Sequence, residues 1–221
     1  GDTIIVQLNA SDGTNTTYKN SSTLTIANTA PNFTKPTIPA TILANTSTIN
    51  ASATIQEGDG EKVNITFTLF VNNNRDSVIT RDNVLDTQQI GVLFNDNWNA
   101  SDTIIVQTNA TDGTNISEYQ NSTTTTVTNI PPEITIPQIS PNPANTTDNL
   151  TGAAVVTDAD PNNKFNVSIV FFKNNVAAVT SSFNNSANNT NISRSYDGSN
   201  FVRGDTIIVQ LNASDGTNTT Y

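Results

Sequence analysis

Hydrophobic and polar residues alternate along many short stretches of the chain, which is the pattern of half-buried β-strands. In the first stretch the residues predicted to face inward are Ile4, Val6, Leu8 and Ala10. It ends at Asp12-Gly13, a dipeptide typical of a type I′ hairpin turn, in which both central residues have positive φ. A second strand follows and ends at Ile26, so residues 1–28 are predicted to form the closing hairpin of a β-domain.

Two longer blocks show the same alternation. After Pro31 the predicted inward residues are Ile49, Ala51, Ala53 and Ile55, then Val63, Ile65, Phe67 and Leu69. After Pro131 they are Leu150, Gly152, Ala154 and Val156, then Phe165, Val167, Ile169 and Phe171. Trp98 and Phe201 are predicted to plug the cores, in preference to forming a sugar-stacking platform. About seven short strands per block, without helical periodicity, predict an all-β fold of tandem immunoglobulin-like β-sandwich domains in a linear array.

The chain repeats itself. Gly1–Tyr18 returns without change as Gly204–Tyr221, and Asp2–Tyr18 matches Asp102–Glu118 at 12 of 17 positions. The copies lie 100 and 103 residues apart, so a unit of one hundred residues alternates between two kinds. We predict a preceding hairpin at residues 1–28, a type 1 domain at 29–129 and a type 2 domain at 130–221 whose last strand is truncated. Proline-containing joints, at Pro31 and Pro131, are expected to be short and stiff.

Composition limits the chemistry. The chain has no His and no Cys, so the usual general base, nucleophile pairs and soft metal ligands are missing. A net charge of −10, with only nine Lys and Arg, disfavours nucleic acid and anionic membranes as partners. No apolar run approaches the roughly 20 residues of a membrane span. A carboxylate-only hydrolase would need two carboxyls across a cleft, which short repeated loops do not suggest, so we expect no enzyme.

Asparagine is in excess, and its neighbours are distinctive. The chain contains 35 Asn and 19 N-x-S/T triplets, the acceptor pattern for N-glycosylation, where composition alone would give about nine. Those predicted on strands share the outward face with their hydroxyl partners: Asn9, Asn50, Asn64, Asn109, Asn149, Asn166 and Asn212. Those predicted on loops are Asn15, Asn20, Asn32, Asn45, Asn99, Asn115, Asn121, Asn145, Asn184, Asn188, Asn191 and Asn218. One explanation of this excess is that many of these Asn carry covalent N-glycans. The other is that Asn, Ser and Thr simply form a soluble surface without sugars. O-glycosylation of Thr123–Thr126 is an unsupported option.

The residues also carry a resemblance. The motifs are a P-x-I near the domain start, a strand leading to TDADPNNK, a V-x-F strand and GDTIIVQLNASDGT followed by TLTIANTAP. Together they resemble the tandem immunoglobulin-like repeats, with cadherin-like and PKD-like relatives, of archaeal and bacterial surface proteins and glycosylated extracellular fibres. The resemblance covers nearly the whole chain and specifies the fold better than any task, because such repeats serve as stalks, lattices and adhesins.

Acidic loops form a second group of candidate residues. Glu57 and Asp59 occupy the same inter-strand loop in the first block as Asp158 and Asp160 do in the second. Closely spaced oxygen ligands suit Ca²⁺, and the resemblance to cadherin-like modules implies calcium at domain joints. The alternative is a solvated turn, which is the commoner meaning of such residues.

Taken together, the sequence predicts an extracellular or cell-surface structural protein. We expect a repeat unit of an N-glycosylated filament, stalk or surface layer, whose partners are copies of itself and its own glycans, without a required cofactor. Separate subunits that exchange strands are a weaker alternative to one continuous polymer. The alternative function is an adhesin or polysaccharide-binding module with calcium-stabilised repeats.

Overall fold

A computed structural model describes residues 1–160 and 163–221. The chain divides into two compact units, of which unit 1 comprises residues 1–38, 50–94 and 105–124 and unit 2 comprises residues 39–49, 95–104 and 125–221. The two units are defined by which residues contact one another, and their limits differ from the predicted domain limits at residues 29 and 130. Those domain limits stay predictions. Residues 130–221, called here the second predicted domain, lie wholly in unit 2.

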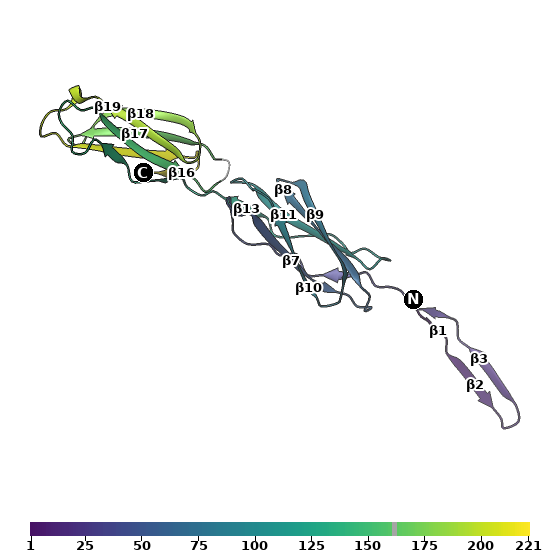
Figure 1. The fold of residues 1–221 in the computed structure, drawn as a ribbon. Coiled ribbons are helices and arrows are strands. Elements are labelled where there is room, and N and C mark those ends of the chain that lie inside the picture. The colour runs from purple at the N-terminus through teal and green to yellow at the C-terminus, as the bar shows by residue number, and fades with distance from the viewer. Residues whose placement is uncertain (161–162) are drawn as a thin grey trace. The chain divides into compact units, whose positions relative to one another are not determined.

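The described residues contain strands and one short 3-10 turn, η1, but no α-helix (Figure 1). The strands that lie wholly or mostly in unit 1 are β1 Thr3–Ile4, β2 Gln7–Ser11, β3 Thr16–Asn20, β4 Leu24–Thr25, β5 Asn32–Phe33, β7 Thr48–Gln56, β8 Val63–Val71, β9 Asn74–Val84, β10 Gln89–Asn95, β11 Thr103–Thr111 and β12 Gln120–Asn121. The elements of unit 2 are β6 Ile42–Leu43, β13 Thr125–Thr128, β14 Glu133–Ile134, β15 Gln138–Ser140, β16 Leu150–Thr157, β17 Phe165–Lys173, β18 Val176–Ser186, β19 Thr190–Tyr196, η1 Gly198–Asn200, β20 Ile207–Ser214 and β21 Thr219–Thr220. The predicted all-β fold class is confirmed.

The predicted alternation is confirmed within the strands. All eight predicted inward residues of β7 and β8 are buried, and so are the eight of β16 and β17. The two aromatic plugs, Trp98 and Phe201, are buried as well. The third copy of the opening motif, β11, buries Ile104, Val106 and Ala110 on one side. A strand sequence with period two therefore predicted its buried face correctly, because side chains of a strand alternate between its two faces.

The second predicted domain is built from two four-stranded sheets. In one, β14, β16 and β15 are neighbours in that order and β19 pairs with β16; the other has the order β18-β17-β20-β21. Buried residues from both sheets form one cluster, which includes Val156, Phe165, Ile192 and Leu211. Two sheets that share one apolar layer make a β-sandwich.

One inward position of this sandwich holds a glycine for a packing reason. A Cβ atom built on Gly152 would lie 2.6 Å from Val209 Cγ2 and 2.8 Å from Phe171 Cζ. In the first block the aligned residues are Ala51 and Leu69, both fully buried. The second domain thus combines a smaller residue on β16 with a larger one on β17, which keeps the volume of the layer nearly constant.

The Asp-Gly turns differ from the prediction. Gly13, Gly113 and Gly216 have positive φ, but the preceding Asp residues do not, so these turns are not type I′. Instead the Asp12 carboxylate accepts the N–H groups of Thr14 and Asn15, at 2.9 and 2.7 Å. Such side-chain bonding to nearby backbone is what Asp does in an Asx turn, and it closes a longer loop.

Two-residue turns with positive φ do occur elsewhere, at positions the sequence analysis missed. Asn72 and Asn73 have φ of 51° and 63° between β8 and β9, and Asn174 and Asn175 have φ of 50° and 65° between β17 and β18. Both central residues of a type I′ turn need positive φ, which Asn tolerates better than other non-glycine residues. The Asn-Asn dipeptides were the sequence signal for these turns, and they account for part of the asparagine excess.

The predicted closing hairpin is present at the start of the chain. β1 pairs with β4 and β2 pairs with β3, both antiparallel. The apolar residues of these strands are exposed, including Ile4, Val6, Leu8, Leu24 and Ile26. The prediction that Ile4, Val6, Leu8 and Ala10 face a core is therefore wrong for this hairpin, because no core covers them among the described residues.

Candidate functional site

None of the 19 predicted acceptor asparagines is buried. Fifteen are exposed: Asn9, Asn15, Asn20, Asn32, Asn45, Asn50, Asn64, Asn99, Asn121, Asn145, Asn149, Asn166, Asn184, Asn188 and Asn191. The remaining four, Asn109, Asn115, Asn212 and Asn218, are half-buried. On most strands the middle residue of the triplet is buried while the Asn is not, as with Ala51 after Asn50 and Val167 after Asn166; after Asn9, Asn20 and Asn184 the middle residue is exposed. The geometry needed for a sugar in solvent is therefore met, while occupancy stays a prediction.

Several acceptors lie on other elements than predicted. Five asparagines that we placed on loops lie on strands: Asn20 on β3, Asn32 on β5, Asn121 on β12, Asn184 on β18 and Asn191 on β19. Conversely, Asn149 directly precedes β16. The reason is that strands here are longer than the hydrophobic alternation alone suggests, because polar edge positions pair through the backbone without contributing a buried side chain.

Some acceptor side chains also support the backbone. Asn64 Oδ1 accepts the N–H of Asn83 at 3.0 Å, and Asn166 Oδ1 accepts that of Asn185 at 3.3 Å. Asn83 and Asn185 have positive φ and lie where the register of the strand pair shifts. Both bonds use Oδ1 and not Nδ2, the atom that would carry a glycan. A sugar at Asn64 or Asn166 is therefore compatible with the bulge that the same side chain stabilises.

We expect Asn188 to be the acceptor that stays unmodified. Its Nδ2 donates to the backbone oxygen of Asp158 at 2.7 Å, and the hydroxyl of Thr190, its partner in the triplet, donates to the backbone oxygen of Ala187. Both reacting groups are thus turned to the protein. Asn184, exposed on β18, is the matched control. Glycopeptide mass spectrometry of native material should find Asn184 modified and Asn188 bare; equal occupancy would contradict this reasoning.

The start of the first predicted domain is tied to that domain's own loops. Asn28 Nδ2 donates to Asp112 Oδ2 at 2.9 Å, and the N–H of Thr29 donates to Asp59 Oδ2 at 2.6 Å. Asp112 belongs to the Asp-Gly turn and Asp59 to the acidic loop. Burial opposes the charge of Asp112, but hydrogen bonds from Asn115, Asn28 and Thr114 hold its pKa below the ordinary value.

The start of the second predicted domain repeats this arrangement one unit later. Asn129 Nδ2 donates to Asp215 Oδ2 at 2.8 Å, and the N–H of Ile130 donates to Asp160 Oδ2 at 3.1 Å. In both copies, therefore, an Asn side chain and the next backbone N–H bind two carboxylates on two different loops. We call this pair of bonds the joint clamp. The prolines predicted stiff joints, but they did not predict the joint clamp. The signal for it was that Asn28 and Asn129 stand in equivalent places before Pro31 and Pro132.

The acidic loops behind the clamps are unusually buried for carboxylates. Asp160 is only 2% exposed and its Oδ1 has no hydrogen-bond partner among the described residues; the same holds for Oε2 of Glu57 in the first copy. Burial raises the pKa of Asp160, the bond from Ile130 lowers it, and the nearby charges of Asp158 and Asp215 raise it again, with a net upward shift. The loop is thus held by hydrogen bonds at an electrostatic cost.

The side chains predicted to bind calcium accept backbone hydrogen bonds within these loops. Asp158 Oδ1 accepts the N–H of Asp160 and Glu57 Oε1 accepts that of Asp59, at 2.8 and 2.9 Å. Over residues 1–160 and 163–221, no three His, Cys, Asp or Glu side chains come together as a group that could hold a metal ion. Pro161 and Asn162 of the predicted acidic loop lie outside the described residues, and calcium stays a prediction of the sequence.

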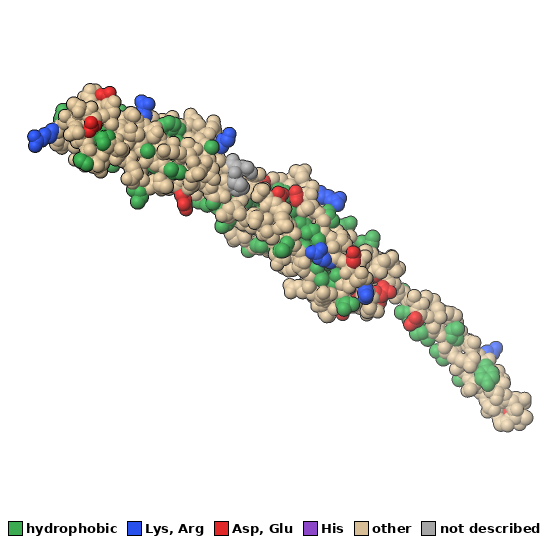
Figure 2. Space-filling model, viewed as in Figure 1, with side chains coloured by type: hydrophobic (Ala, Val, Ile, Leu, Met, Phe, Trp, Pro, Cys, Tyr) green, Lys and Arg blue, Asp and Glu red, His purple; other side chains and the backbone are tan. Residues whose placement is uncertain are grey.

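Uncharged polar groups dominate the outside. On the face shown in Figure 2, charged side chains are few and scattered, and tan atoms cover most of the surface. The described part of the chain contains no helix long and apolar enough to cross a membrane. The expectations that the protein is no enzyme and binds no nucleic acid rest on composition alone.

Comparisons with known proteins give a likeness of fold only. No protein-family model matches the chain, and no curated protein matches it in sequence. Among solved structures, it is similar to the crystal structure of chicken CNTN1 FN1-FN3 domains, at 9% identity and a TM-score of 0.31, over 98% of this chain and 72% of that chain. It is also similar to red sea bream transglutaminase, at 10% identity and a TM-score of 0.37, over 85% of this chain and 29% of that chain. Likenesses this remote carry no information about function.

Proposed function

We propose that the chain is a structural repeat unit of an N-glycosylated extracellular filament, stalk or surface layer. The observation that carries the proposal is the placement of the 19 acceptor asparagines, none of which is buried although many lie on strands whose neighbouring residues are. The triplets also number 19, where composition alone would give about nine.

The proposed role is mechanical. Each sandwich would act as a compact link, and the joint clamp would limit bending where one domain leads into the next. Glycans on the outward faces would keep exposed strand edges from pairing with other proteins, a task that charge cannot perform in a chain with only 13% charged residues.

Intact-mass measurement of native material, before and after enzymatic or chemical deglycosylation, tests the glycan part of this proposal. We expect the native mass to fall on deglycosylation and to show a ladder of glycoforms before it. A native mass equal to that of the polypeptide would refute it. Electron microscopy of the same material tests the structural part: uniform filaments with a repeat of two domains support it, whereas discrete monomers that bind polysaccharides on a glycan array would favour the adhesin.

A further inference from the structure

The second predicted domain has an open edge where the first has two further strand segments. In the first block, β12 and β13 both pair with β11, through Gln107 and Thr108 and through Thr103 and Ile104, respectively. The aligned strand of the second domain is β20, and on this edge its only pairing among the described residues is with β21, through Ala213 and Ser214.

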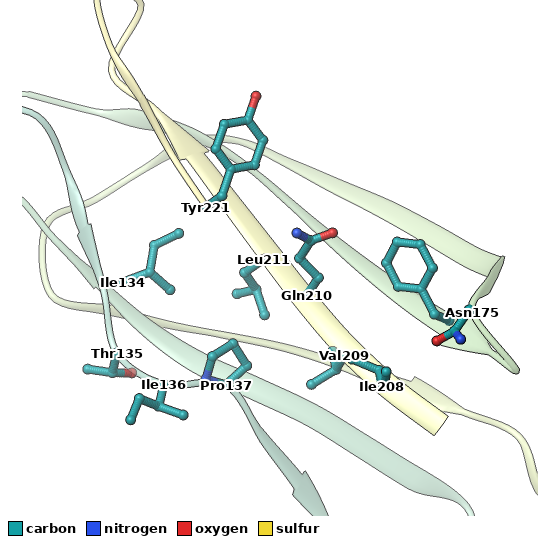
Figure 3. A pocket seen from close by; sticks show the side chains of 11 residues that line it. Ile134, Thr135, Ile136, Pro137, Asn175, Ile208, Val209, Gln210, Leu211 and Tyr221 are labelled. Atoms are coloured by element: carbon teal, nitrogen blue, oxygen red, sulfur yellow. The ribbon is translucent and has the colours of Figure 1, made fainter. Parts of the chain in front are cut away.

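Two grooves follow this open edge, and the first of them is lined mainly by apolar side chains. The first, of ≈ 580 Å³, lies between Ile134–Pro137 and Ile208–Leu211 of β20, with Tyr221 beside it (Figure 3). In the first block, the residues aligned with Ile134 and Val209 are Phe33 and Val106. There they bind residues 120–122, because Gln120 Nε2 donates to Phe33 O and Ser122 N–H donates to Val106 O.

The second groove, of ≈ 660 Å³, continues the first and is lined by Ile207, Pro143, Ala144 and Leu150 among others. In the first block, the residues aligned with Pro143 and Ala144 are Ile42 and Leu43, which pair in parallel with Val127 and Thr128 of β13. The two grooves together therefore trace the positions of β12 and β13.

The chain carries a segment that matches these positions. Residues 19–28 align with 120–129, and they pair with β1 and β2 just as β12 and β13 pair with β11. Ser21 N–H donates to Val6 O and Ile26 N–H donates to Asp2 O, each at 2.8 Å; the aligned bonds of Ser122 and Val127 in the first block are also 2.8 Å long. Because Gly1–Tyr18 and Gly204–Tyr221 are identical, β20 offers this segment the same partners.

Burial favours the exchange. Leu24 and Ile26 are 58% and 45% exposed in the hairpin, whereas the aligned Thr125 and Val127 are 6% and 2% exposed in the first block. Moving the segment from residues 1–11 to the identical residues 204–214 keeps the backbone pairing and adds apolar contact. We propose that the edge of β20 in one copy of the chain binds residues Lys19–Asn28 of a second copy as an antiparallel strand, with Thr206 opposite Thr25 of that second copy.

A disulfide tests the register, because the chain has no cysteine of its own. Thr3 and Thr25 form a pair without mutual hydrogen bonds, since Ile26 N–H binds Asp2 O; such pairs bring Cα atoms within the range a disulfide spans. The double variant Thr25→Cys, Thr206→Cys should form disulfide-linked oligomers larger than dimers under mild oxidation. The control Thr25→Cys, Gln210→Cys, with the second thiol four residues along β20, should stop at dimers, as should Thr25→Cys alone.

Adding Leu24→Asp and Ile26→Asp to the first variant should reduce these oligomers about tenfold or more, because two charges would enter positions whose aligned residues, Thr125 and Val127, are buried. Adding Thr23→Asp should leave them unchanged, because the aligned Thr124 is exposed. Oligomers formed equally by the Thr206 and Gln210 variants, or no oligomers, would overturn the proposal. A disulfide within a single chain would overturn it too, by showing that the segment returns to its own groove.

The proposed strand exchange adds to the proposed function. It rests on that function only where it assigns a role to the assembly. The experiment uses unglycosylated recombinant chain. Bare asparagines in native material would therefore remove the proposed function and leave the disulfide result intact. Failure of the disulfide oligomers would remove strand exchange between copies and leave the glycan measurement intact.

Discussion

Replacing Gly152 with alanine is expected to destabilise the second predicted domain by about 1–2 kcal/mol, which corresponds to a fall in Tm of roughly 5–15 °C for a domain of this size. The added Cβ would lie 2.6 Å from Val209 Cγ2 and 2.8 Å from Phe171 Cζ, closer than carbon atoms approach without repulsion. The backbone of Gly152 is extended, so alanine brings a small opposing gain from the unfolded state, which the estimate includes.

The matched control is Gly91→Ala. Gly91 also lies inside a strand, β10, but it is exposed, and the nearest atom to its added Cβ is Asn50 Oδ1 at 3.4 Å. Thermal unfolding followed by circular dichroism should show little change for this variant. Equal effects of the two substitutions would mean that loss of glycine, and not crowding in the core, sets the cost.

A double variant tests whether the two domains differ by an exchange of volume. Phe171→Leu alone should also destabilise, because it leaves a cavity and removes the stacking of Phe171 on Tyr196, whose ring centroids are 5.2 Å apart. Gly152→Ala with Phe171→Leu recreates the Ala51 and Leu69 combination of the first block. The double variant should therefore be more stable than the sum of the single effects predicts, and strict additivity would contradict the exchange.

Strand faces could be predicted from the sequence because burial on one face requires a period of two, and the inward residues from Ile49 to Phe171 obeyed it. The turn type could not be predicted from the sequence, because an Asp-Gly dipeptide is compatible with more than one type of turn. The Asp12 carboxylate determines the turn, because its hydrogen bonds from the N–H groups of Thr14 and Asn15 close a longer loop. Asn72-Asn73 was the better type I′ signal, and it was hidden among asparagines that serve other purposes.

The candidate site was predictable in its exposure and not in its contacts. Outward placement of acceptors such as Asn50 follows from alternation with Ala51 alone. The joint clamp joins residues 84 to 86 positions apart, such as Asn28 with Asp112 and Asn129 with Asp215. No local pattern encodes such a pair. The sequence signal for the clamp is that Asn, Asp-Gly and the acidic loop recur in each hundred-residue repeat. That signal can be interpreted only when the fold shows that the three lie together.

Two substitutions at the second joint clamp are expected to change stability in opposite directions. At neutral pH and with chelator present, Asp160→Asn should raise the Tm of the second domain and Asp215→Asn should lower it, each by an amount corresponding to about 1 kcal/mol. At residue 160 the amide keeps an oxygen acceptor for Ile130 and removes a buried charge that the nearby charges of Asp158 and Asp215 oppose. At residue 215 an amide Nδ2 would meet the Nδ2 of Asn129, so one hydrogen bond is lost.

The pH dependence follows from the directions of the two pKa shifts. Burial and nearby charges raise the pKa of Asp160, so its ionised form costs stability at neutral pH, and that cost disappears as pH falls through its folded pKa. Burial acts against the charge of Asp215, but bonds with Asn129, Asn218 and Thr217 lower its pKa, so its contribution is complete above the unfolded value and is lost in acid. Both variants should therefore approach the wild-type Tm as the pH is lowered.

Thermal unfolding of the wild type and both variants from neutral pH down to about pH 2 measures these effects, because the contribution of Asp215 is lost only below the ordinary pKa of Asp. The same measurement decides between the solvated turn and calcium, because a bound cation would offset the repulsion that makes Asp160 costly. With added Ca²⁺ in place of chelator, a calcium site would raise the wild-type Tm and reverse the advantage of Asp160→Asn. If Asp160→Asn destabilises even with chelator, the buried carboxylate has a favourable partner beyond Ile130 and Asn163, whose Nδ2 donates to Asp160 Oδ2 at 3.3 Å, and the electrostatic account of the joint is wrong.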